Sequence, residues 1–226
     1  MRAHKIICAL ILALAGCGNA EPGLNDAIKL VVGEIGIAPA APAAALPAYA
    51  DLVALPYASI GLRLEGAPDA PIALLAANSF VNGRVWYVDM ARRGVILEGG
   101  RVAGSRGMVQ DLLGAQFSSD DPLTNRTAPQ DWPSETLLIQ RARDGVGEEY
   151  IRAYRCSVTY HGEESAELYQ RSLPLAHFSE SCSGGQVAFQ NDHWVDPVDG
   201  RMWKTRQWTG PGTGFVDVVV IRAFGD

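Results

Sequence analysis

The chain has 226 residues, of which 48% are hydrophobic, and its formal net charge at pH 7 is −6. This apolar content is typical of a chain with a folded core and excludes a wholly disordered protein. The acidic balance argues against nucleic acid as a partner, because binding to phosphates needs clustered Lys and Arg.

The N-terminus has the layout of a signal peptide. A basic start precedes an apolar run over residues 6–15, which is shorter than the roughly 20 residues that a transmembrane helix needs. The run ends in Leu-Ala-Gly-Cys at Cys17, which resembles a bacterial lipobox, where the thiol receives diacylglycerol and cleavage occurs before the cysteine. We predict a lipoprotein signal peptide over residues 1–16 and a lipid on Cys17; the alternative is an ordinary signal peptide with a chance cysteine.

Residues 17–50 are predicted to form the lipid anchor, a helix and a linker. Gly18 follows the lipid-bearing cysteine, and by resemblance to enterobacterial lipoproteins the absence of Asp there implies sorting to the outer membrane. Apolar residues recur at helical spacing over residues 25–35, and packing on the domain is favoured over the membrane because Lys29 is the only cation of this segment. Residues 38–50 are rich in Ala and Pro and indicate a semi-rigid linker.

Residues 51–226 are predicted to form one all-β domain. Apolar and polar residues alternate over residues 58–65, which is typical of a half-buried strand. Further strands are predicted around recurring turn signals, namely Asn82-Gly83, Gly99-Gly100, Asp144-Gly145 and Pro197-Val198-Asp199-Gly200. These strands are 71–81, 84–90, 95–98, 101–103, 136–143, 148–160, 166–173, 186–196, 201–208 and 215–224. Consecutive hairpins predict a single antiparallel meander, which should curl into an open barrel or a sandwich.

Two segments of this domain lack a strand pattern. Residues 107–114 are predicted to form one or two helical turns, which adds one further short helix to the N-terminal one. Residues 117–135 are polar and interrupted by prolines, and they form the longest stretch without predicted structure. A loop of this length is usually functional or mobile.

The chain contains four cysteines. Cys8 lies in the leader and Cys17 is the expected lipid site, which leaves Cys156 and Cys182. Disulfides persist in exported proteins, so we favour a bridge between these two over a pair of buried free thiols.

Two stretches of the β domain carry a recognisable pattern. They are residues 54–64 (ALPYASIGLRL) and residues 189–201 (FQNDHWVDPVDGR), the second continuing through Lys204, Arg206, Gln207 and Gly210. Together with the lipobox they resemble the YjbF/GfcB family of group 4 capsule polysaccharide lipoproteins, in order from about residue 24 to 224. The resemblance implies an outer-membrane lipoprotein encoded with exopolysaccharide or capsule export genes. It implies no established enzyme activity, so no catalytic residues are carried over.

The second stretch has another likeness. Its Trp-Val-Asp-Pro and Asp-Gly-Arg segments look like a hairpin of periplasmic lipoprotein carriers of the LolA/LolB type, which are unclosed barrels around an apolar cavity. This likeness covers one hairpin, so it favours a curved sheet and adds little for lipid binding.

Four polar residues gather near one turn of that hairpin: Asp192, His193, Asp196 and Asp199. They could hold a cation or offer paired carboxylates for glycosidic chemistry. A glycosidase needs two carboxyls opposed across a sugar, usually on different strands, whereas Asp196 and Asp199 suit turn positions. The spacing also differs from that of an EF-hand, so we predict no catalytic residue here.

Other chemical motifs are incomplete. His161, His177 and His193 lack the short spacings of zinc ligands, so no metal site is predicted. The Gly-rich segment 210–214 runs into a strand, whereas a phosphate loop runs into a helix, and Ser105 lacks the nucleophile-elbow pattern. No cofactor is expected.

Aromatic residues are the remaining lead. Besides Tyr57, Trp86 and Tyr87 they include the candidate binding surface Trp194, Trp203 and Trp208. On a sheet face they could stack against sugar rings, but Trp is usually well buried, so core packing is the favoured alternative.

The sequence thus predicts a non-enzymatic lipoprotein of the outer membrane, facing the periplasm and accessory to exopolysaccharide or capsule assembly and export. Its expected partners are proteins of the export system, with polysaccharide as a further candidate, and the expected contact surfaces are the loop 117–135 and the C-terminal aromatic sheet. Two alternatives stay open. A continuous apolar cavity would favour a LolA/LolB-like carrier of lipid or acylated cargo, and converging buried carboxylates in a cleft would favour a polysaccharide-modifying enzyme.

Overall fold

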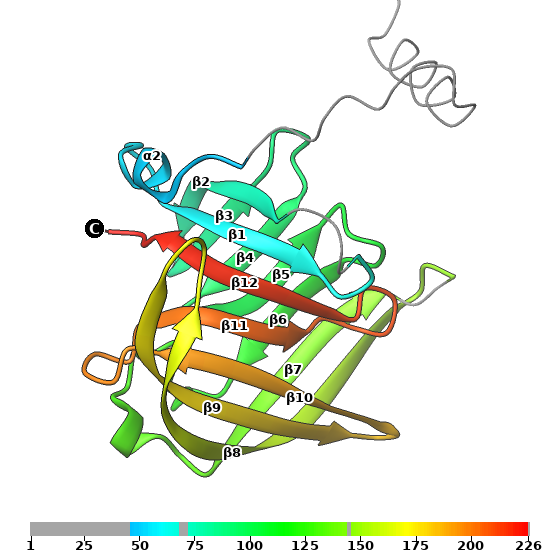
Figure 1. Ribbon diagram of the computed structural model, residues 1–226. Coiled ribbons are helices and arrows are strands. Elements are labelled where there is room, and N and C mark those ends of the chain that lie inside the picture. The colour runs from blue at the N-terminus through cyan, green and yellow to red at the C-terminus, as the bar shows by residue number, and fades with distance from the viewer. Residues whose placement is uncertain (1–45, 68–71, 144–145, 226) are drawn as a thin grey trace, which may run out of the picture. The chain divides into compact units, whose positions relative to one another are not determined.

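The computed structural model describes residues 46–67, 72–143 and 146–225 (Figure 1). The signal peptide predicted over residues 1–16, the lipid site at Cys17 and the helix predicted over residues 25–35 lie outside the described residues. From Pro47 onward the chain forms one compact unit. Among the described residues, no helix has the length and apolar character needed to cross a membrane.

The described part of the chain contains twelve antiparallel strands in a single meander. They are β1 (Ser59–Leu64), β2 (Ala73–Val81), β3 (Arg84–Val88), β4 (Gly94–Glu98), β5 (Arg101–Arg106), β6 (Leu112–Phe117), β7 (Glu135–Arg143), β8 (Glu149–Glu167), β9 (Ser172–Gly184), β10 (Val187–Val195), β11 (Met202–Trp208) and β12 (Phe215–Arg222). Strands β1 and β12 pair with each other, whereas β5 and β6 stand at the two ends of the hydrogen-bonded order. The sheet therefore curls into a nearly closed barrel, as Figure 1 shows, and the predicted all-β meander is confirmed.

Tight turns set the register of several hairpins. Asn82 and Gly83, between β2 and β3, have φ angles of 50° and 79°, as a two-residue hairpin turn requires. Gly99 and Gly100 likewise have φ angles of 59° and 111° between β4 and β5. These two predicted hairpins are confirmed, while the turn at residues 144–145 lies outside the described residues.

Side chains bridge the seam between β5 and β6. The Leu112 N–H donates to Ser105 Oγ at 2.8 Å, and Arg84 Nη2 donates to the Ala115 carbonyl at 3.0 Å. Arg84 is itself held by Glu98 on β4. These contacts cover backbone groups that would otherwise attract a foreign strand.

The short helices lie elsewhere than predicted. The helix expected over residues 107–114 is wrong, because Asp111 Oδ1 accepts the Met108 N–H in a turn and Leu112 then enters β6. The described residues instead hold one α-helix, α2 (Tyr49–Val53), and one 3-10 helix, η1 (Pro129–Asp131). Helix α2 falls at the end of the predicted linker, where the prolines stop.

The strand predicted over residues 166–173 is also wrong. Residues 168–171 form the turn between β8 and β9, closed by a hydrogen bond from the Leu168 N–H to the Arg171 carbonyl. Strand β9 was not predicted, and β8 extends through a polar run that shows little alternation. The length of both strands follows from their pairing with each other from Arg155 to Glu167, which is a tertiary effect.

The inward side chains fill the barrel with an apolar cluster that includes Ile60, Val95 and Val195, all fully buried. Cys156 on β8 and Cys182 on β9 face each other in the ladder, with Cα atoms 3.9 Å apart, and form the predicted disulfide. The bridge is buried in this cluster.

A second apolar cluster lies on the outer face of β12. Leu52 of α2 and Tyr169 of the β8–β9 turn pack there against Val219 and Ile221. Figure 1 shows the β8–β9 hairpin rising across the barrel towards α2. The two segments are far apart in sequence, so this cluster ties the start of the described chain to the barrel.

Candidate functional site

The barrel interior contains a buried ion cluster centred on Arg101 at the start of β5. Arg101 donates to both carboxylate oxygens of Glu180 on β9, at 2.9 and 2.7 Å, and to Asp121 of the β6–β7 loop. All three side chains are at most 2% exposed. A buried charge set of this kind persists only when each member is paired.

Further inward side chains complete the coordination of Glu180. Thr136 Oγ1 and Asn191 Nδ2 donate to its two oxygens at 2.7 and 2.9 Å. His193 Nε2 lies 3.6 Å from Glu180 Oε2, beyond hydrogen-bond distance, while its Nδ1 is 2.8 Å from Thr205 Oγ1. The cluster therefore draws on strands β5, β7, β9, β10 and β11.

This arrangement favours an ionised carboxylate at Glu180. Burial opposes the charge, but the Arg101 guanidinium, His193 and the Thr136 hydrogen bond outweigh it, so the pKa of Glu180 lies well below its usual range. The general acid of a glycosidase needs the opposite, a raised pKa and contact with the substrate. The cluster is thus suited to fixing the interior of the barrel.

The predicted polar group near the β10–β11 turn does not converge. Asp192 faces outward and His193 inward, as neighbours on a strand must. Asp196 Oδ1 accepts the backbone N–H groups of Val198 and Asp199, which is the turn role expected for it. Asp199 Oδ1 in turn accepts the backbone N–H of the residue two positions on.

Two other motifs also have structural roles. In the segment 210–214 the Gly214 N–H donates to the Gly210 carbonyl, which closes the β11–β12 turn as expected. Ser105 accepts a backbone hydrogen bond at the seam. Among the described residues, Cys156, Glu180 and Cys182 are the one group spaced as metal ligands, but both sulfurs belong to the disulfide, so no thiolate is offered.

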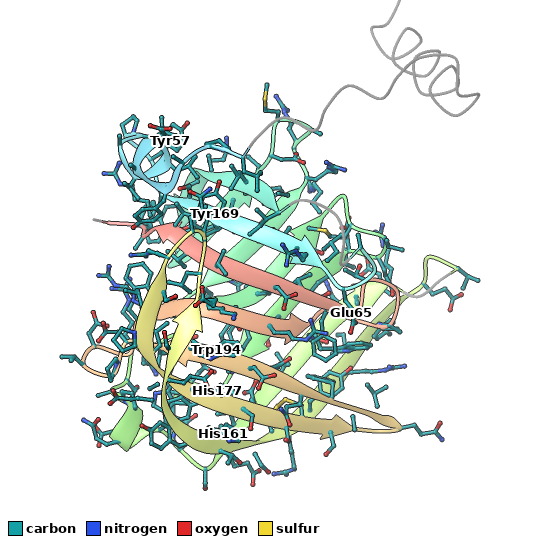
Figure 2. The ribbon with its side chains drawn as sticks, viewed as in Figure 1. Tyr57, Glu65, His161, Tyr169, His177 and Trp194 are labelled. Carbon is teal, nitrogen blue, oxygen red and sulfur yellow. A yellow bond between two sulfur atoms is a disulfide. The ribbon has the colours of Figure 1, made fainter. Side chains whose placement is uncertain are left out.

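The outer face of strands β8 to β11 carries three rings and one ammonium group in a row, which we call the outer row: His161, His177, Trp194 and Lys204. Figure 2 shows the first three side by side. The rings of His177 and Trp194 stack with centroids 4.6 Å apart, and Lys204 Nζ lies 4.4 Å from the Trp194 centroid. Because β10 lies between β9 and β11, His177 and Lys204 approach Trp194 from opposite sides, which leaves little ring surface for a sugar.

Carboxylates hold the outer row together. Glu164 accepts the indole N–H of Trp194 and lies 3.6 Å from His177 Nδ1. Asp192 lies 3.1 Å from His177 Nε2. Because Glu164 lies near the C-terminal end of β8 and Trp194 lies on β10, these contacts also hold that end of β8 close to β10.

The other aromatic candidates are distributed over the barrel. Trp203 lies under the Arg171 guanidinium at 4.7 Å, and Trp208 stacks on Phe189 with ring centroids 5.7 Å apart. Tyr87 faces the core, where burial raises the pKa of its phenol to about 12. The six aromatic candidates thus form no single platform, and among these six only Tyr57 is exposed, at 41%.

Side chains of the turn between β8 and β9 form hydrogen bonds with the start of the described chain at α2. Tyr169 Oη and Gln170 Nε2 both donate to the Pro47 carbonyl, and the Tyr49 N–H donates to Gln170 Oε1. Gln170 has a φ angle of 53°, which is uncommon for a residue other than glycine. Its two side-chain contacts to the N-terminal segment hold it in that conformation.

The loop 117–135 is packed across one end of the barrel. Leu123 is fully buried, and Trp132 stacks on Phe178 with ring centroids 3.9 Å apart. The turn glycines approach it closely: a Cβ on Gly99 would meet the Leu123 carbonyl at 2.4 Å, and one on Gly200 the Thr127 carbonyl at 2.3 Å. The exposed positions of this loop therefore stand on a fixed backbone.

Sequence reasoning missed Arg101, Asp121 and Glu180. Arg101 stands directly after a predicted Gly-Gly turn, but the first four residues of β5 are all buried, so alternation gave no sign that the Arg101 side chain points inward. Glu180 lies in the strand that was not predicted, and Asp121 in a loop. No local pattern signals that these three charges meet.

These features define a filled antiparallel β-barrel whose candidate contact surfaces lie on its outer face and at its ends. The chain matches the family described as "Group 4 capsule polysaccharide lipoprotein gfcB, YjbF" over residues 26–221. It belongs to that family, as its sequence led us to expect.

The fold has a solved counterpart. The crystal structure of the hypothetical lipoprotein YmcC from Escherichia coli (K12) matches with a TM-score of 0.69 at 17% sequence identity, over 92% of this chain and 100% of that chain. At this identity the likeness shows the fold alone. No curated protein matches the chain significantly.

Proposed function

We propose that this protein is a non-enzymatic lipoprotein that assists the assembly or export of a capsule or exopolysaccharide. Membership of the capsule polysaccharide lipoprotein family carries the proposal. The geometry of the interior supports a binding role, because Asp121 and Glu180 are both occupied by Arg101 and sealed from substrate. The filled interior likewise favours this role over that of a lipid carrier.

The proposed location is the periplasmic face of the outer membrane, with the lipid on Cys17 as the anchor. Each buried methylene contributes about 0.8 kcal/mol, so two or more acyl chains hold a protein firmly. Cys17→Ser should leave the protein unprocessed or release it from the membrane. If membrane fractionation finds that variant cleaved and bound like the parent, the anchor proposal is wrong.

We further propose that the protein acts by contact with proteins of an export assembly. The outer row and the exposed positions of the loop 117–135 are the proposed contact surfaces, because rigidly held loops commonly carry binding. Gln130 and Asp131 of η1 are exposed and can be changed without touching the buried part of the loop.

The test is the amount of secreted polymer in a deletion strain that carries each variant. Gln130→Ala with Asp131→Ala should lower secretion, and so should Cys17→Ser. Asp196→Asn with Asp199→Asn should leave it nearly unchanged, since both residues accept backbone hydrogen bonds in the β10–β11 turn and belong to neither contact surface. If the Asp196 and Asp199 variant stays folded and anchored but abolishes secretion, the non-enzymatic role is refuted.

A further inference from the structure

A pocket of about 350 Å³ lies at the barrel end where β1 begins and β2 and β12 finish. Its walls include Tyr57, Asn78, Phe80, Arg222 and Phe224. Tyr57 lies beside α2 in Figure 2, on the side of the barrel where the C-terminal segment emerges in Figure 1.

The aromatic walls of this pocket are open to solvent. Tyr57, Phe80 and Phe224 are 41%, 53% and 41% exposed, whereas the Trp194 ring is enclosed between His177 and Lys204. Phe80 and Phe224 stack on each other, with centroids 4.9 Å apart and an interplanar angle of 22°. Large aromatic rings left at the surface together indicate a contact site.

Irregular pairing shapes the same place. In β2, Ala77 pairs with Tyr87 and Ser79 with Trp86, so Asn78 is an extra residue without a partner on β3. In β12, a second irregularity directly precedes Arg222, which pairs with Ser59. Bulges re-aim side chains and are over-represented beside binding sites. Here they bring an amide and a guanidinium to the rim of an aromatic pocket.

The chemistry of the walls selects among ligands. A sugar ring offers an apolar C–H face and a rim of hydroxyls, which match aromatic rings beside the Asn78 amide, the Ser79 hydroxyl and the Tyr57 phenol. An added peptide strand needs an unpaired edge, but β1, β2 and β12 are each paired on both sides. A bilayer surface would favour a wholly apolar patch, which the polar walls interrupt.

We propose that this pocket binds sugar residues of a polysaccharide chain. The inference rests on the proposed function, because a role in polysaccharide assembly brings glycan chains to the protein. It deepens that function by giving the barrel a direct contact with the polymer, in addition to its protein partners. A volume of about 350 Å³ suits a short piece of a glycan.

Binding is tested with the lipidated mature protein in lipid nanodiscs and short oligosaccharides cut from the exported polymer of the producing strain. Saturation-transfer NMR should show binding to the parent protein. Phe80→Ala and Phe224→Ala should each weaken it by about tenfold, which corresponds to about 1.4 kcal/mol, because each removes one of the two stacked rings from the pocket wall. Tyr160→Ala is the matched control, because Tyr160 is 54% exposed and lies on β8, outside the pocket.

Asn78→Ala keeps the test valid where an aromatic variant fails to fold, because Asn78 is exposed and unpaired in the sheet. It should also weaken binding. The proposal is overturned if the parent protein shows no binding, if pocket variants bind as the parent does, or if Tyr160→Ala loses as much. Pocket variants that change the affinity for empty nanodiscs and leave oligosaccharide binding intact would overturn it as well.

Secretion measured in the deletion strain separates this inference from the proposed function. If deletion lowers polymer secretion but the parent protein binds no oligosaccharide, the sugar site is wrong and the accessory role stands. If deletion leaves secretion unchanged, the accessory role is wrong, whatever the binding result.

Discussion

The inner and outer faces of strands β9 and β10 carry two polar clusters built from alternate residues of the same segments. Glu180 and His193 point into the barrel and His177 and Asp192 point out, so residues adjacent in sequence serve opposite faces. Inside, the Glu180 carboxylate is sealed from water and paired with a guanidinium. Outside, the side chains of His177 and Asp192 are each 19% exposed, so water partly screens their interaction.

Charged residues of the same types therefore contribute different amounts to stability on the two faces. Removing one partner of a buried pair leaves an uncompensated charge and costs about 3–5 kcal/mol, whereas an exposed pair contributes at most about 1 kcal/mol. The inner cluster should therefore govern folding and the outer row should be free to serve contacts. Substitutions on the two faces should therefore differ in their effect on the free energy of unfolding.

The largest effect is expected from Arg101→Met. This variant leaves Glu180 and Asp121 buried without their cation, so the free energy of unfolding should fall by about 3–5 kcal/mol. Urea denaturation measures the change. Arg101→Met combined with Glu180→Leu is the control and should recover part of the loss; a double variant no more stable than the single one would contradict the ion-pair explanation.

The second largest loss of stability is expected when the disulfide is removed. Cys156→Ala with Cys182→Ala releases a bridge with a sequence separation of 26, which on the chain-entropy model stabilises by about 3 kcal/mol. Thermal unfolding of the oxidised parent and of this variant measures the difference. A reduced parent that unfolds at the temperature of the oxidised one would show that the bridge contributes nothing.

The pH dependence of the free energy of unfolding should reflect the ionisation of the Glu180 carboxyl. Because its folded pKa lies below the usual range, Glu180 contributes stability that is fully present above the ordinary carboxyl pKa of about 4.3 and is lost as the pH falls below it. The free energy of unfolding should therefore decrease with acidification below about pH 4.5, and Glu180→Gln should flatten that slope. An unchanged slope in the variant would assign the acid sensitivity to other carboxylates.

A smaller loss of stability is expected when a hydrogen bond between the β8–β9 turn and the start of the described chain is removed. Tyr169→Phe removes one hydrogen bond to the Pro47 carbonyl and keeps the ring in its cluster, so stability should fall by about 1 kcal/mol. Hydrogen exchange of the α2 amides should rise in the variant. Unchanged exchange would mean that the apolar cluster alone holds α2 in place.

The smallest effect should come from the outer row. Glu164→Gln weakens an exposed contact with His177 and keeps a side chain able to accept the Trp194 N–H, so stability should change by less than about 1 kcal/mol. Urea denaturation of Glu164→Gln and of Arg101→Met measures the loss of stability in each variant. A loss as large as that of the buried variant would erase the distinction between the two faces.

The sequence by itself determined the antiparallel meander, its tight turns and the family. Asn82-Gly83 and Gly99-Gly100 specify hairpins locally, because few residues adopt positive φ without strain. The pairing of Cys156 with Cys182 was also readable, since the other two cysteines fell in the predicted leader and at the predicted lipid site. Turn signals placed most of the other strands, and alternation placed the first one because it records which residues face a core.

Only the tertiary structure decided the length of β8 and β9, the packed loop 117–135 and the clusters on the two faces. The 166–173 segment reads locally as a strand, yet its middle must turn so that Tyr169 can reach α2. Arg101, Asp121 and Glu180 come from a strand start, a loop and a polar strand, and each is unfavourable in a core when alone. Asp121 and Glu180 lie 20 and 79 positions from Arg101 in sequence. The ion pairs that make these three charges compatible with burial therefore form only after the barrel has closed.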